Sequence, residues 1–85
     1  MVQVRKSTGQ VQSFDANTLI NSIAKYADNI NVELSHTKNN RLVNLVLEKI
    51  QDREIVEIDE LNSIIALCLD EVDYRIAEAY RKALV

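Results

Sequence analysis

Glycine occurs once in this chain of 85 residues and proline does not occur, so almost nothing in the sequence interrupts a helix. Both residue types strongly disfavour helix interiors, and their scarcity therefore favours a mostly helical fold. Hydrophobic residues make up 47% of the chain, which is typical of a globular protein and not of a disordered one. A chain this short buries only about 60–65% of its unfolded surface, which leaves little room for an interior catalytic cavity.

The single glycine lies in a polar segment, residues 7–10, between two segments in which apolar and polar residues alternate. A tight hairpin turn needs a residue that tolerates positive φ, and Gly9 supplies it. We therefore predict strands over about 2–6 and 10–13. An isolated two-stranded hairpin is marginal in water, so this one must pack against the rest of the chain.

Apolar residues at helical spacing follow the hairpin in four segments. The predicted helices cover about 15–29, 36–50, 59–69 and 74–84. Asp15, Ser35 and Asp59 stand where N-cap residues are expected, an extended piece is predicted at 55–58, and residues 70–73 are expected to break the third helix from the fourth. The predicted fold is mainly α: one domain over residues 1–85, with four antiparallel helices capped by an N-terminal β-hairpin.

The charge is unevenly distributed, although the net charge is only -3. Arg5 and Lys6 lie in the first fourteen residues without any acid, whereas acids predominate from Asp52 to Glu78, where we expect a solvated face. An acidic half makes a poor nonspecific binder of DNA or of an anionic membrane, so neither is expected as a partner. The basic first segment suits a small anion. No signal peptide follows Met1, no apolar run approaches the ~20 residues that a bilayer requires, and a cytoplasmic location is expected.

Several residues that often carry chemistry have simpler structural interpretations here. Cys68 is the only cysteine and lies in an apolar run, so it is expected as a buried small hydrophobe in a reducing compartment, without a disulfide or a Cys-rich zinc site. His36 is isolated in a polar stretch. Tyr74 and Tyr80 are expected in the core with their hydroxyls at its rim. No metal-ligand spacing and no nucleophile–base pair stands out, so we predict no metal site, no catalytic residue and no catalytic cofactor.

Three segments of the chain resemble the ATP-cone family. The segment from Val4 to Asp15, VRKSTGQVQSFD, resembles the family opening V-x-K-R-D-G-x-x-x-x-F-D. The segment from Val56 to Leu61 is similar to the entry of the family's third helix, and Asp73–Arg81 is similar to its final Y-x-x-A-x-A-Y helix. The three motifs stand in the family's order and separation, and together they span essentially the whole chain.

The resemblance implies a regulatory domain that is not itself an enzyme. ATP-cones bind ATP or dATP between the hairpin and the helices, and the choice of nucleotide changes quaternary structure. They occur at the N-terminus of ribonucleotide reductases and in a repressor of reductase genes, whose zinc ribbon needs cysteines that this chain lacks. We therefore expect a fragment of a ribonucleotide reductase, of the anaerobic type. Its partners would be the rest of the reductase chain or its subunits, with ATP or dATP, and Mg²⁺ as a companion ion, as allosteric ligand.

Carried over residue by residue, the resemblance implies a nucleotide site at the hairpin and the start of the first helix. Lys6 would meet phosphate oxygens as a cation, Phe14 and Leu19 would pack against the base or close the pocket, and Asp15 would contact base or sugar. The N-terminus of the first helix would add unpaired N–H groups and a positive dipole end. The predicted nucleotide-binding residues are Val4, Lys6, Ser7, Gln12, Phe14, Asp15, Thr18 and Leu19.

Three positions depart from the family pattern: Ser7 replaces an arginine, Thr8 an aspartate, and Thr18 a lysine. Hydrogen bonds to charged groups contribute ~1.5–3 kcal/mol each, so two lost cations would weaken triphosphate binding by more than about a hundredfold. Lys6 itself could be an exposed strand lysine that keeps the hairpin edge soluble, and Asp15 is in the first place a helix cap.

Two other readings therefore stay open. A degenerate ATP-cone would keep the fold without binding nucleotide and would act as a structural or subunit-interaction module. An acyl carrier protein is also an acidic four-helix domain of this size. Its carrier site needs Asp-Ser-Leu at a helix start, however, and the nearest match, Asn62-Ser63-Ile64, lacks the acid and lies inside a predicted helix.

Overall fold

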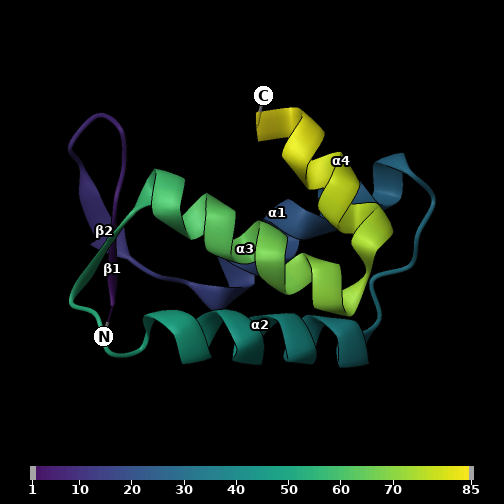
Figure 1. The fold of residues 1–85 in the computed structure, drawn as a ribbon, viewed down its shortest axis with the longest axis horizontal. Helices are drawn as coiled ribbons and strands as arrows, with labels where there is room; N and C mark the ends of the chain where they lie inside the picture. The colour runs from purple at the N-terminus through teal and green to yellow at the C-terminus, as the bar shows by residue number, and fades with distance from the viewer. Residues whose placement is uncertain (1, 85) are drawn as a thin grey trace.

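A small sheet at one end of four helices makes up residues 2–84, the part of the chain that the computed structural model describes (Figure 1). The strands are β1 (Gln3–Arg5), β2 (Val11–Ser13) and β3 (Ile55–Glu57). The helices are α1 (Ala16–Asn29), α2 (His36–Ile50), α3 (Ile58–Val72) and α4 (Tyr74–Leu84). The prediction of a mainly α fold with four helices and an N-terminal hairpin is confirmed.

The turn of the hairpin lies at Gly9, as predicted. β1 and β2 pair antiparallel, and the Gly9 N–H donates to the Lys6 carbonyl at 2.8 Å. Gly9 has φ +92°, a conformation that side-chain-bearing residues rarely adopt. The prediction of a two-stranded hairpin was incomplete, because the extended segment at 55–58 supplies a third strand. β3 pairs parallel with β1, so the strand order is β2-β1-β3 and β1 is central.

The two faces of this sheet differ in what covers them. Val4 and Val56 pair across β1 and β3 and are buried against the helices. Gln12, opposite Val4 on β2, lies on the same face. The opposite face carries an ion pair between Arg5 and Glu57, with the Arg5 guanidinium 2.9 Å from the carboxylate. Because side chains alternate along a strand, the side chains of the inner face are the ones that point toward the helices.

Two of the three predicted N-caps are confirmed. The Asp15 carboxylate accepts hydrogen bonds from the Asn17 and Thr18 N–H groups, at 2.8 and 3.4 Å, and Ser35 caps α2. The prediction for Asp59 was wrong: α3 begins at Ile58, no side chain caps it, and Asp59 lies in its first turn. There an acid still interacts favourably with the helix dipole.

The core is formed by one stripe from each helix together with the inner face of the sheet. Cys68 is fully buried, as predicted, and burial raises the pKa of its thiol. Tyr80 is buried too, and its ring meets Tyr26 edge to face with centroids 5.3 Å apart. The prediction of a core position for Tyr74 was wrong, since it is 63% exposed at the start of α4.

The link between α3 and α4 is shorter and more ordered than predicted. α3 continues to Val72, so Asp73 alone separates the helices instead of the segment 70–73. Its carboxylate accepts hydrogen bonds from the Lys38 ammonium at 2.9 Å and from the Arg75 guanidinium at 2.9 and 3.1 Å. It also accepts the Arg75 backbone N–H, which caps α4. We call Lys38, Asp73 and Arg75 the Asp73 corner.

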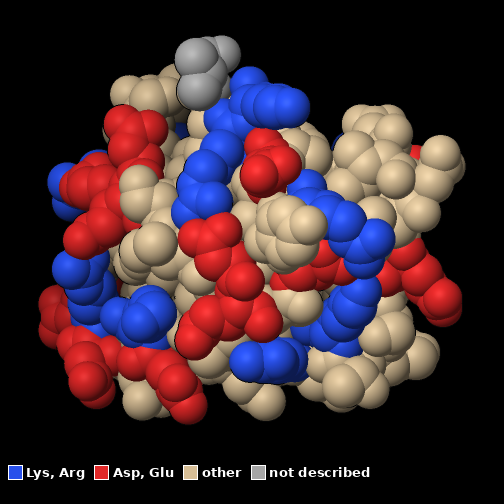
Figure 2. Space-filling view, turned by 45° about the vertical axis from the view of Figure 1, so that its right-hand side comes forward, with Lys and Arg blue, Asp and Glu red and all other residues tan. Residues whose placement is uncertain are grey.

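The Asp73 corner corrects the expectation of a uniformly solvated acidic face. Only 6% of the Asp73 side chain is exposed, and hydrogen bonds from Arg75 and Lys38 hold its pKa well below the usual range. Three further acids pair with arginines, so four of the five arginines of the chain are neutralised: Arg5–Glu57, Arg53–Glu60, Arg75–Asp73 and Arg81–Asp70. Figure 2 accordingly shows basic and acidic side chains interspersed on one face of the molecule.

Candidate functional site

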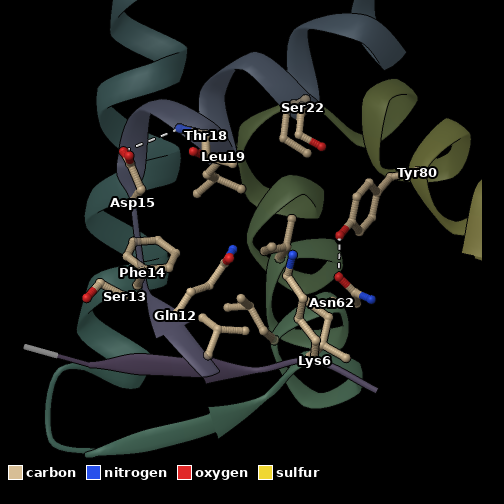
Figure 3. A pocket seen from close by; sticks show the side chains of 15 residues that line it. Lys6, Gln12, Ser13, Phe14, Asp15, Thr18, Leu19, Ser22, Asn62 and Tyr80 are labelled. Carbon is tan, nitrogen blue, oxygen red and sulfur yellow. Dashed lines mark hydrogen bonds between the residues drawn. The ribbon is translucent and has the colours of Figure 1, made fainter. Parts of the chain in front are cut away.

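A pocket opens between the inner face of the sheet and helices α1, α3 and α4 (Figure 3). We call it the sheet–helix pocket. Its volume is about 170 Å³ and it is open to solvent. It is lined by Val4, Lys6, Gln12, Ser13, Phe14, Asp15, Thr18, Leu19, Ser22, Ile23, Ile58, Leu61, Asn62, Ile65 and Tyr80. Segments from both halves of the chain therefore build this one site.

The floor of the pocket is apolar because it continues the hydrophobic core. Val4, Leu19, Leu61 and Ile65 are each at most 6% exposed and belong to the same buried cluster. Phe14 is half-buried and packs against that cluster, one residue before the cap of α1. A flat apolar surface of this kind suits the face of an aromatic ring.

Two polar side chains reach over this floor from the hairpin. Figure 3 shows Lys6 and Gln12 extending toward the middle of the pocket. Within residues 2–84, neither side chain has a hydrogen-bond partner, and Lys6 is the only cation that lines the pocket. A glutamine carboxamide offers a donor and an acceptor side by side, whereas an ammonium offers donors only. The hairpin thus presents a carboxamide and a positive charge to the pocket.

The α3 and α4 side of the pocket carries a hydrogen-bonded pair. The Tyr80 hydroxyl donates to the Asn62 Oδ1 atom at 2.9 Å. Burial, with a smaller contribution from Tyr26, raises the pKa of Tyr80 to about 12, so its hydroxyl stays protonated at neutral pH. Because Asn62 accepts through its oxygen, its NH₂ group keeps two donors to offer. This pair links α4 to the pocket.

The N-terminus of α1 differs from the expectation of unpaired N–H groups. The Asp15 carboxylate already accepts the N–H groups of Asn17 and Thr18. Figure 3 shows this carboxylate turned toward the first turn of the helix. Two of the free N–H groups at the start of α1 are therefore already bonded within the protein, and a negative charge of the protein stands beside the positive end of the helix dipole.

The structure brings seven of the eight predicted site residues together around the pocket; their role in binding stays a prediction. Ser7 is the exception, because it lies in the exposed hairpin turn and does not line the pocket. Sequence reasoning did not assign Asn62 or Ser22 to the site, and it treated Tyr80 only as a core residue. One signal was available: Asn62 is a polar residue directly after Leu61 in an otherwise apolar helix face.

Other sites receive no support from the described residues. Within residues 2–84, no group of three or more His, Cys, Asp or Glu side chains is arranged to hold a metal ion, and His36 is exposed at the start of α2. None of the helices in this range has the length and apolar character needed to cross a membrane.

A pocket between a hairpin and a helical bundle is the arrangement that the sequence resemblance implies. The family model of the ATP cone domain matches residues 2–83. The chain therefore belongs to the ATP-cone family, whose domains are nucleotide-binding regulatory modules and not catalysts. A search of curated proteins found no match to the chain.

Proposed function

We propose that the sheet–helix pocket binds the adenine end of ATP or dATP. The observation that carries this proposal is a pair of side chains above an apolar floor, Gln12 and Lys6, which have no hydrogen-bond partner among residues 2–84. A glutamine carboxamide can bond adenine through N6 and N7, whereas guanine presents only acceptors at the corresponding edge. Gln12 is therefore the candidate for reading the base.

The size of the pocket fits only part of a nucleotide. Sites that enclose whole small-molecule ligands usually measure roughly 300–1,000 Å³, and this one measures about 170 Å³. We propose that base and sugar occupy the pocket against Val4, Phe14 and Leu19, while the phosphates lie at its mouth near Lys6. Any Mg²⁺ would then travel with the phosphates, since Asp15 is the only acid among the described lining residues.

The signal would leave the pocket through α3 and α4. A ligand shifts a conformational equilibrium only by its differential affinity for the two states. Tyr80 and Asn62 belong to two helices and both line the pocket, so their bond is a contact that a ligand can change. We propose that the altered outer helix faces control subunit contacts of a cytoplasmic ribonucleotide reductase of the anaerobic type, either in the same chain or as a separate subunit.

Binding can be tested directly by calorimetric titration with ATP and dATP, with GTP as the control ligand. Amide chemical shifts recorded in parallel should change mainly in residues 2–20 and around Asn62 and Tyr80. The absence of heat and of any shift change at millimolar adenine nucleotide would contradict the proposal. Binding of GTP with equal affinity would contradict the role given to Gln12.

A degenerate cone is the second candidate, and one observation favours it. Ser7 and Thr8 lie in an exposed turn without charge, and Thr18 offers no cation at the pocket. A domain that binds no nucleotide but still associates with a reductase subunit would support this alternative. Measuring the association of the two proteins with and without ATP separates the cases, because only a sensor responds to the nucleotide.

A further inference from the structure

We infer that the sheet–helix pocket recognises the nucleoside part of its ligand and that its affinity depends little on the number of attached phosphates, from none to three. This inference rests on the proposed function, because it specifies which adenine compounds the same pocket accepts. It follows from the charges that surround the pocket. Two features of the structure limit the contribution of the phosphates, and the net charge of the lining follows from them.

The first feature is that positive charge around the pocket is scarce. Among the lining residues of the described chain, Lys6 is the single cation. Arg5 is its neighbour in sequence, but its side chain lies on the outer face of the sheet and pairs with Glu57 at 2.9 Å. The alternation of side chains along β1 prevents Arg5 from turning to the pocket without breaking the strand pairing.

The second feature is the occupied N-terminus of α1. Helix N-termini often bind phosphates through their unpaired N–H groups. Here the Asp15 carboxylate takes those of Asn17 and Thr18. Asp15 therefore takes up two N–H groups that an anion could use and adds a negative charge to the lining of the pocket.

The net charge of the lining follows from these two features. Lys6 and Asp15 carry opposite charges, so the lining that the described residues form is neutral. Both side chains are exposed, and interactions between exposed charges are weakened by water and salt. A second or third phosphate therefore finds no additional cation among the described lining residues.

The expected result is a shallow dependence of affinity on phosphate number. One exposed charge-assisted contact changes affinity by about tenfold. We expect adenosine, AMP, ADP and ATP to bind the full chain with dissociation constants within about tenfold of one another in calorimetric titrations at constant salt. ATP binding more than a hundredfold tighter than adenosine would overturn the inference and leave the proposed function intact. If none of the four compounds binds, the proposed function itself fails.

Two variants separate the contributions of the charged residues. Asp15→Asn keeps an efficient N-cap but removes the negative charge. Because ATP is charged and adenosine is not, it should tighten ATP binding more than adenosine binding. Lys6→Met should lower ATP affinity to the level of adenosine. Equal effects of either substitution on both ligands would contradict the inference, since a contact to base or sugar would not distinguish them.

The matched control is Arg5→Met, which removes a cation one residue away on the opposite face of the sheet. It should leave the affinities for ATP and adenosine unchanged. A loss of ATP affinity in Arg5→Met as large as in Lys6→Met would show that the net charge of the domain, and not the lining of the pocket, sets the phosphate dependence. Circular dichroism of each variant confirms that the fold is retained.

Discussion

The Asp73 corner and the sheet–helix pocket both join segments that are distant in sequence, but they use polar groups in opposite ways. At the corner, one carboxylate accepts hydrogen bonds from Lys38 and Arg75 and is almost completely withdrawn from water. At the pocket, Lys6 and Gln12 have no hydrogen-bond partner within residues 2–84 and face a cavity. Polar groups that satisfy each other stabilise a fold, whereas polar groups without partners beside a cavity are available to a ligand.

The difference predicts which substitutions affect stability and which affect binding. Substitutions at the corner should lower the free energy of unfolding and leave the pocket residues in place. Substitutions of the hairpin side chains should change ligand affinity at almost constant stability. The following predictions test this division, starting with the largest expected effect.

Asp73→Ala should have the largest effect. It removes the N-cap of α4 and leaves the Lys38 ammonium, which is partly buried, without its partner. A lost cap costs about 1 kcal/mol and lost hydrogen bonds to a charged group about 1.5–3 kcal/mol, so the free energy of unfolding should fall by about 2–4 kcal/mol. Urea denaturation measures it. Glu71→Ala, an exposed acid near the end of α3, is the control and should change the value by less than about 0.5 kcal/mol.

The pH dependence of Asp73→Asn should isolate the charge of the corner. The pKa of Asp73 is lowered in the folded state, so its ionised form contributes stability above the ordinary aspartate value of about 3.9. The stability difference between wild type and variant should be constant above about pH 5 and should shrink as the pH falls from the ordinary aspartate pKa toward the lowered folded pKa. A difference that stays constant down to pH 2 would mean that the charge contributes nothing.

Tyr80→Phe should have an intermediate effect, because Tyr80 lines the pocket but its hydroxyl, unlike Lys6 and Gln12, already has a partner in the protein. The substitution keeps the buried ring and its contact with Tyr26 but removes the hydrogen bond to Asn62. The free energy of unfolding should fall by about 1 kcal/mol. Because this pair is the proposed link from the pocket to α4, nucleotide-induced shift changes in α4 should diminish while those in the hairpin persist. Unchanged shifts throughout α4 would remove Tyr80 from the proposed signal path.

Lys6→Ala should have the smallest effect on stability and a clear effect on binding. The side chain is exposed and makes no hydrogen bond within the described residues, so the free energy of unfolding should change by less than about 0.5 kcal/mol. ATP affinity should fall by about tenfold. A large fall in melting temperature would place Lys6 with the structural groups of the corner and break the comparison.

Local signals in the sequence predicted most of the helical fold. The hydrogen bonds of the N-caps Asp15 and Ser35 reach at most three residues along the chain, and those of the turn at Gly9 reach at most four. The prediction for Asp59 failed although aspartate is a common N-cap residue. β3 ends at Glu57 and α3 begins at the next residue, so Asp59 already lies inside the helix. A residue type that favours the N-cap position therefore does not show where a helix begins when a strand leads directly into that helix.

Long-range pairings could not be predicted in the same way. Lys38 and Asp73 are 35 residues apart, and no periodicity connects them. The three residues of β3 are too few to show alternation. The resemblance nevertheless placed seven site residues at the pocket, because those residues lie in one continuous segment of the hairpin and α1. Asn62 and Tyr80 come from elsewhere in the chain, and only the tertiary structure shows that they complete the wall.

The parallel pairing of β1 with β3 also has a consequence for the order in which the molecule folds. Arg5 and Glu57 meet although they are 52 residues apart, and α1 and α2 lie in the loop between them. Closing a long loop costs entropy that local contacts do not, so this pairing should form late, after the intervening helices. Until then the pocket has only part of its wall. A ligand would therefore bind only the completely folded chain, and it would raise the melting temperature of the whole domain as its concentration increases.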